Sequence, residues 1–226
     1  MLTQTEKLRG CSSMDGHISR AAIGDYLAAL GSNSAAPGGG SSAALSGAMA
    51  AALVSMVANL TIGREKYADY QELASRTAEK SQALVLELTD CVRKDMNAFD
   101  GVMAAFRMPK STDEERAERS RAVQEAYKGA TGAPVETAEK CLEVLKLAEG
   151  LLGKSNVTAC IDLSAAAIEA RAGITIALEN VNVNLAAIRD GEYVSRMRAW
   201  ADDIDAESQR LLALIRVGVA EMMGGK

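Results

Sequence analysis

One carboxylate occupies a position where an apolar side chain would be expected. Steps of four and three residues along one predicted helix face reach Leu88, Val92, Asp95, Phe99, Val102 and Phe106. Because burying an ionised carboxylate costs free energy, burial raises its pKa toward the range useful for proton transfer. Asp95 is therefore a candidate general acid or base. The alternative is a buried aspartate that caps a helix or pairs with an arginine or lysine of another helix.

Three glycines follow a proline in the segment "SNSAAPGGGSS", and no charged residue occurs between Asp25 and Arg64. Glycine lets backbone N–H groups approach a ligand, and a helix N-terminus favours negative charge or a carbonyl oxygen. The segment also fits the G-x-G-x-x-A pattern of dinucleotide sites, but a helical pattern rather than a strand precedes it. Residues 37–41 are therefore either a ligand-binding turn or a flexible joint between helices.

Two asparagines lie four residues apart, Asn180 and Asn184, so their amides share one face of a helix. Side-chain amides can pair with an aminopyrimidinone edge such as that of a pterin. The alternative is hydrogen bonding between helices by core asparagines.

Several other chemistries are excluded. The only histidine, His17, lies in an irregular N-terminal segment, so a Ser-His-Asp or Cys-His nucleophile is not expected. No metal-ligand spacing occurs, which predicts no metal. Any reaction must therefore use carboxylates, amides, lysines and backbone N–H groups.

Helical periodicity dominates the elements that must position these groups. The first three predicted helices cover about residues 23–30, 41–61 and 65–108. A capping box at Thr112 and Glu115 predicts the start of the next helix, which is interrupted at the joint "GATGAP". The last three predicted helices cover about residues 135–152, from "KSN" to 190, and 193–223. Long helices with short connections predict an all-α fold. Residues 19–226 form a single helical bundle, preceded by an irregular N-terminus over residues 1–18.

Composition narrows the class of protein. The formal net charge of −5 argues against nucleic acid or an anionic membrane as the main partner. Residues 43–60 are too rich in alanine and serine for a membrane span. The four cysteines have no C-x-x-C spacing and no signal peptide precedes them, which predicts reduced thiols in a cytoplasmic protein.

The segments "APGGGSSAALSGAMAAALVSMVANLTIGREKY", "DMNAFDGVMAAFRMPKSTDEE" and "NVNVNL" resemble the cyclodeaminase/cyclohydrolase family. That family comprises the C-terminal domain of formiminotransferase-cyclodeaminase and stand-alone methenyltetrahydrofolate cyclohydrolases. The resemblance covers the chain from about residue 19 and implies an all-helical homodimer that processes one-carbon units on tetrahydrofolate, with no metal and no permanently bound cofactor.

The resemblance also implies roles for particular residues. The catalytic carboxylate of the D-x-x-A-F pattern falls on Asp95, and the lysine of the L-P-K pattern on Lys110, with Met108 in place of leucine. The substrate-binding positions fall on Pro37, Gly38, Gly39, Gly40, Ser41, Asn180, Asn184 and Asp162. Beside Asp162, Ile161 and Ser164 depart from the small residues usual in the family.

Two reactions fit the resemblance: hydrolysis of 5,10-methenyltetrahydrofolate to 10-formyltetrahydrofolate, and cyclisation of 5-formiminotetrahydrofolate with loss of ammonia. The long match around the glycines and the absence of a transferase domain favour the cyclohydrolase. Arg64 and Lys66 are candidate partners for the glutamate tail. A folate-binding module without activity and a helical scaffold with a small-residue dimer seam are the remaining alternatives.

Overall fold

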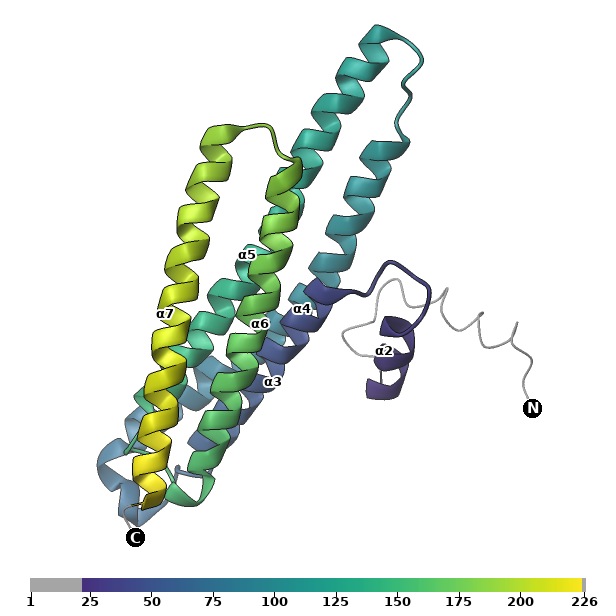
Figure 1. The fold of residues 1–226 in the computed structure, drawn as a ribbon. Helices are drawn as coiled ribbons and strands as arrows, with labels where there is room; N and C mark the ends of the chain where they lie inside the picture. The colour runs from purple at the N-terminus through teal and green to yellow at the C-terminus, as the bar shows by residue number, and fades with distance from the viewer. Residues whose placement is uncertain (1–21, 225–226) are drawn as a thin grey trace, which may run out of the picture.

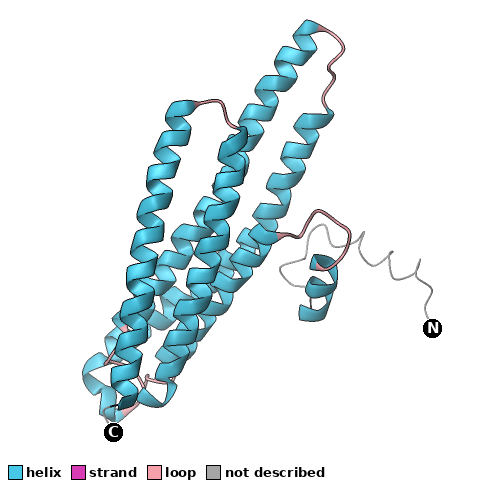
Figure 2. Cartoon of the chain, viewed as in Figure 1, coloured by secondary structure: helices cyan, strands magenta, loops and turns pink. Residues whose placement is uncertain are grey.

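The computed structural model describes residues 22–224, and every regular element in that range is a helix (Figures 1 and 2). The α-helices are α2 (Ile23–Leu30), α3 (Gly39–Asn59), α4 (Gln71–Arg107), α5 (Asp113–Gly150), α6 (Cys160–Ala187) and α7 (Gly191–Gly224), with short 3-10 helices at η3 (Glu65–Tyr70) and η4 (Val157–Ala159). The predicted all-α fold is confirmed. The irregular segment predicted for residues 1–18, with His17, lies outside the described residues.

The five long helices form one elongated bundle (Figure 1). α3 packs between α4 and α6, α5 packs against α4 and α6, and α7 covers α6 and α5. The last turns of α4 and the first turns of α5 project beyond the N-terminal end of α3, and the short helix α2 lies beside that end. The N-terminus of α3 therefore lies partway along the bundle, against α4, and not at its tip.

Small residues let α3 run through the centre of the bundle. Twelve of its 21 residues are buried, and they are alanine, glycine, serine and valine. A Cβ built on Gly47 would lie 3.0 Å from Cδ2 of Leu88 and closer to Sγ of Cys141, and one on Gly173 would lie 2.9 Å from the carbonyl oxygen of Ala43. Glycine is thus required where α3 crosses its neighbours, because a methyl group would push the helices apart.

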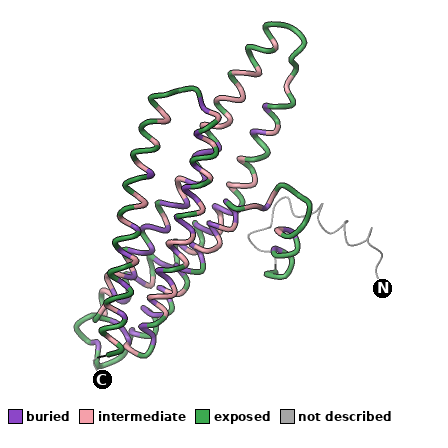
Figure 3. Tube along the Cα trace, in the orientation of Figure 1, coloured by how far each residue is buried: buried purple, intermediate pink, exposed green. Residues whose placement is uncertain are grey.

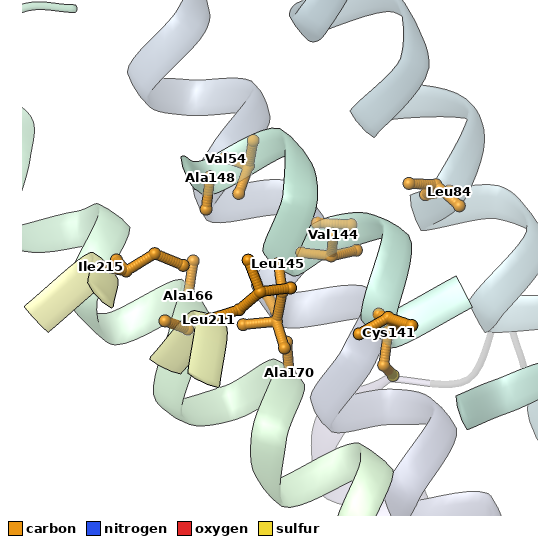
Figure 4. Close-up of a cluster of buried hydrophobic side chains, with 14 of the residues drawn as sticks. Val54, Leu84, Cys141, Val144, Leu145, Ala148, Ala166, Ala170, Leu211 and Ile215 are labelled. Carbon is orange, nitrogen blue, oxygen red and sulfur yellow. The ribbon is translucent and has the colours of Figure 1, made fainter. Parts of the chain in front are cut away.

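The main core extends from this crossing toward the end of the bundle that holds the C-terminus (Figure 3). Figure 4 shows Leu145 and Val144 of α5 surrounded by Val54, Ala166 and Leu211, which come from α3, α6 and α7. Burial of these side chains supplies the main driving force for assembling the helices.

The predicted joint at residues 129–134 is wrong, since α5 runs unbroken through Pro134. A proline inside a helix leaves the carbonyl four residues earlier without its N–H donor. Here Nδ2 of Asn184 in α6 donates to that carbonyl, of Ala130, at 3.2 Å. The replacement hydrogen bond from another helix explains how the proline is accommodated.

Other boundaries differ less. The helix predicted from residue 65 begins as η3, with non-helical backbone at Tyr67, and continues as α4 from Gln71. The capping box is confirmed: the backbone N–H of Glu115 donates to Thr112 Oγ1 at 3.2 Å, and the Glu115 carboxylate accepts from the Thr112 N–H at 3.2 Å. The segment "VNVNL" is helical, as predicted.

The apolar seam predicted around Asp95 is buried over only part of its length. Leu88, Val92 and Val102 are buried, but Phe99 and Phe106 are 40% and 39% exposed. The physical reason is that α3 begins at Gly39, so the last turns of α4 extend past it and have no α3 to cover them. Asp95 lies at this transition between the buried and the projecting parts of α4.

By length and hydropathy alone, α3 could also cross a membrane, with a mean hydropathy of 1.6 over its most apolar stretch. Of that stretch, 61% is buried inside the bundle, as in the core helix of a soluble protein. The expectation that the chain has no membrane partner stays a prediction.

Candidate active site

Asp95 of α4 is positioned against the first turn of α3. The hydroxyl of Ser41 donates to Oδ2 of Asp95 at 2.9 Å, across 54 positions of sequence. A Cβ built on Gly40 would lie 2.6 Å from Cγ of Asp95 and nearer still to Oδ1. The carboxylate therefore occupies the space that any side chain at residue 40 would need.

This contact caps α3 from outside the helix. The residue before the first turn, Gly38, has no side chain to accept the free N–H groups there. Asp95 accepts a hydrogen bond from the hydroxyl of Ser41, and the backbone N–H of the same residue also favours its ionised form. A carboxylate at a helix N-terminus is also favoured by the helix dipole, and α3 has no acidic residue in its own first turn. Asp95 thus fulfils the capping role named as the alternative, together with the geometry of a candidate base.

Burial affects the pKa of Asp95 more than the contacts with Ser41 do. It raises the pKa of the carboxyl above its ordinary value, while the hydroxyl and the N–H of Ser41 lower it by less. A carboxylate that only capped an exposed helix would have its pKa lowered, not raised. The raised pKa moves Asp95 toward the range of a general base that works near neutral pH.

Asn180 of α6 borders the same helix end. Its Nδ2 donates to the carbonyl of Ile176 in its own helix at 2.8 Å, and a Cβ built on Gly39 would lie 3.7 Å from that Nδ2. The first turn of α3 thus lies between Asp95 and Asn180. Pro37, which precedes the turn, is buried and follows a cis peptide bond at Ala36.

Asn184 has a structural contact of its own, since its amide donates to the carbonyl left free by Pro134. That contact matches the alternative of hydrogen bonding between helices. Its predicted role in substrate binding stays a prediction.

The remaining predicted site residues lie far from Asp95 within the chain. Lys110 is exposed in the connection beyond Arg107, and 12 residues of α4 separate Arg107 from Asp95, about 18 Å of helix. Asp162 lies in the first turn of α6, 18 residues and thus about 27 Å of helix before Asn180.

Arg64 and Lys66 follow the C-terminal end of α3, at the opposite end of that helix from Gly40. Nε of Arg64 donates to the carbonyl of Leu60 at 2.7 Å, and Nζ of Lys66 lies 5.6 Å from the ring centroid of Tyr67. The structure brings together Asp95, residues 37–41 and Asn180, and it does not bring Lys110, Asp162, Arg64 or Lys66 to them.

The sequence did not single out Tyr26 as a site residue. It belongs to the apolar stripe of α2, and a tyrosine in such a stripe looks like an ordinary core residue. In the structure it packs against α3 and α4 close to Asp95. Among the described residues, no group of three or more histidine, cysteine or acidic side chains could hold a metal ion.

Comparison with known proteins places this geometry in a family. The family model of formiminotransferase-cyclodeaminase matches residues 22–203. The chain belongs to that family. The match includes every residue of the Asp95 site, from residue 37 to Asn180, and also Tyr26.

Individual relatives agree with the family assignment. The chain is 43% identical over 161 residues to the methenyltetrahydrofolate cyclohydrolase of Methylorubrum extorquens, covering 71% of this chain and 74% of the relative. It is 32% identical to the formimidoyltransferase-cyclodeaminase of Rattus norvegicus over 72% of this chain, but it spans only 30% of that longer protein.

The crystal structure of formiminotetrahydrofolate cyclodeaminase from Thermotoga maritima superimposes with a TM-score of 0.83 at 26% identity. It covers 92% of this chain and 100% of that chain. The whole helical bundle is therefore shared with this solved structure.

We expect Gly40→Ala to lower kcat/KM about 100-fold or more, because the new methyl group displaces the Asp95 carboxylate from the first turn of α3. Steady-state kinetics on a folate substrate would measure the effect. The matched control is Gly101→Ala on the exposed face of α4, where no atom lies within 4 Å of an added Cβ. Equal activity of both variants would contradict the placement of Asp95.

Proposed function

We propose that this chain is a methenyltetrahydrofolate cyclohydrolase, which hydrolyses 5,10-methenyltetrahydrofolate to 10-formyltetrahydrofolate. The observation that carries the proposal is a half-buried carboxyl, of raised pKa, held at a glycine-rich helix N-terminus. The 43% identical relative that bears this name supports the choice of reaction.

The substrate carries positive charge on the amidinium group that joins N5, the one-carbon unit and N10. In the proposed reaction Asp95 accepts a proton from the attacking water as the oxygen bonds to the one-carbon centre. The bond from this carbon to N5 then breaks, N5 takes up a proton, and the new hydroxyl loses one as it becomes the formyl oxygen on N10. One proton is released overall, and no metal or permanently bound cofactor is needed for these steps.

The binding positions follow from the same geometry. Backbone N–H groups of the first turn of α3, at Gly39 and Gly40, favour a carbonyl oxygen or developing negative charge. Asn180 lies beside Gly39, where its side-chain oxygen can accept from an amino group of the pterin. The folate therefore lies over the N-terminal end of α3, between α4 and α6.

The second candidate function is formiminotetrahydrofolate cyclodeaminase. In that reaction N10 attacks the formimino carbon and ammonia leaves, so one carboxyl can again accept and return protons. The shared bundle with the cyclodeaminase of Thermotoga maritima favours this candidate. A folate-binding protein without activity and a scaffold are the outcomes left if neither substrate reacts.

A turnover assay of both folates separates these functions. We expect wild type to hydrolyse 5,10-methenyltetrahydrofolate above the spontaneous rate, and Asp95→Asn to lose at least about 100-fold in kcat, because the amide cannot accept the proton. Ammonia release from 5-formiminotetrahydrofolate without methenyl hydrolysis would instead assign the cyclodeaminase. No turnover of either substrate would contradict both.

We also propose that the chain acts as a cytoplasmic homodimer, with the outer face of α3 as the interface between copies. This face is apolar and partly exposed, and it comprises Leu45, Met49, Leu53, Met56 and Leu60. α3 carries no charge, so the same surface of a second copy can cover it without burying an unpaired charge. A second copy can also bring residues that are distant within one chain, such as Lys110, Asp162, Arg64 or Lys66, toward the Asp95 site.

Light scattering would measure the mass in solution. We expect twice the chain mass of 23.7 kDa for wild type, and a shift to monomer when Met49 and Met56 are both changed to glutamate. The matched control, Val217→Glu, adds a charge at an exposed apolar position of α7 and leaves the mass unchanged. A monomeric wild type would contradict the homodimer, and a dimeric double variant would contradict this interface.

A further inference from the structure

Tyr26 buries a hydroxyl that finds no hydrogen-bond partner among residues 22–224. The residue is only 5% exposed. Burying a phenol oxygen without a partner costs free energy that a phenylalanine at the same place would avoid. An unpaired buried polar group in a folded protein calls for an explanation beyond packing.

The packing of the ring places Tyr26 near the proposed reaction centre. Tyr26 packs in one cluster with Ala44 of α3 and with Cys91 and Val92 of α4, and Met96 borders the cluster. Ala44 lies one helical turn after Gly40 and Ser41, and Val92 and Met96 lie on either side of Asp95 along α4. Tyr26 therefore lies against the same two helices, and at the same level, as the contact between Ser41 and Asp95.

The charge of Asp95 acts on this tyrosine. Burial is the larger cause that raises the pKa of Tyr26, and the nearby Asp95 carboxylate raises it further. The phenol therefore remains protonated throughout the neutral range. The protonated phenol can therefore donate a hydrogen bond to a group that carries negative charge or a lone pair.

We propose that the hydroxyl of Tyr26 donates a hydrogen bond to the substrate atom that reacts beside Asp95. The inference rests on the proposed function and adds a donor to the acceptor already described. In hydrolysis the atom is the oxygen already bonded to the one-carbon centre, at the step where its hydroxyl loses the proton and the bond to N5 breaks, and in cyclodeamination it is the departing nitrogen. The donor stabilises electron density that builds up on this atom while Asp95 handles the proton. No proton leaves the phenol, so the proton balance of the reaction is unchanged.

Tyr26→Phe isolates the hydroxyl, because the ring and its packing remain. We expect kcat to fall about 10–100-fold with KM changed less than about threefold, since the contact is made to the reacting atom. The midpoint of thermal unfolding stays equal or rises, because an unpaired buried polar atom is removed. Loss of kcat without loss of stability is a result that a merely structural tyrosine would not produce.

Tyr67→Phe is the matched control, because the Tyr67 hydroxyl accepts a hydrogen bond from the backbone N–H of Val157 at 3.0 Å, far from Asp95. This variant should lose stability and keep kcat. A double variant of Tyr26→Phe with Asp95→Asn should be no slower than Asp95→Asn alone, because both groups serve one step.

The outcomes separate this inference from the proposed function. Wild-type turnover with an unchanged kcat in Tyr26→Phe overturns the role of Tyr26 and leaves the function standing. A change confined to KM, or a fall in kcat that merely follows a loss of folded protein, overturns it as well. A wild type that turns over neither folate overturns the function and this role together.

Discussion

The contact between Asp95 and the first turn of α3 constrains the rest of the structure. A carboxylate this close to a helix N-terminus requires α4 to approach α3 so nearly that residue 40 has no side chain. The same closeness continues along α3, where Gly47 meets Leu88 of α4 and Cys141 of α5. A central helix of small, uncharged residues is therefore a packing requirement and a condition for placing the carboxylate.

Stability and function are opposed at this point. Burial raises the pKa of Asp95, so the folded protein holds its proton more tightly than the unfolded chain does. The resulting loss of folding stability is absent at pH values below the ordinary pKa of an aspartate. It is fully present at pH values above the raised pKa of Asp95 in the folded protein. The hydrogen bonds from Ser41 offset part of this cost. The folded protein is thus less stable than it would be without this buried carboxylate, and the base is available near neutral pH, as is common at active sites.

Much of this could be predicted from local sequence. The spacing of apolar residues predicted the helices, and Asp95 was conspicuous because it interrupted an apolar pattern. The partner of Asp95 could not be predicted, because Ser41 lies 54 positions away and only the crossing of two helices brings it near. The continuous α5 was missed for the same reason: the amide that replaces the missing N–H of Pro134 comes from Asn184 on another helix.

Tertiary structure also decides which of the predicted site residues lie near Asp95 and which lie far from it. The motifs place Lys110, Asp162 and Asp95 in one predicted site, whereas the length of the helices separates Lys110 from Asp95, and Asp162 from Asn180, by about 18 Å or more within one chain. Tyr26 shows the reverse case. Its spacing marks it as a core residue, and only its unpaired hydroxyl and its place beside Asp95 distinguish it from one.

The pH dependence of kcat/KM in wild type and in Ser41→Ala tests the central claim that Asp95 is the base. A base must be ionised, so activity falls as pH drops through its pKa. We predict an acid limb whose midpoint lies above the ordinary aspartate value of about 3.9. The midpoint should move to still higher pH in Ser41→Ala, because that variant loses a hydrogen bond to the ionised form. A midpoint at the ordinary value, or one that is identical in both proteins, would contradict the account.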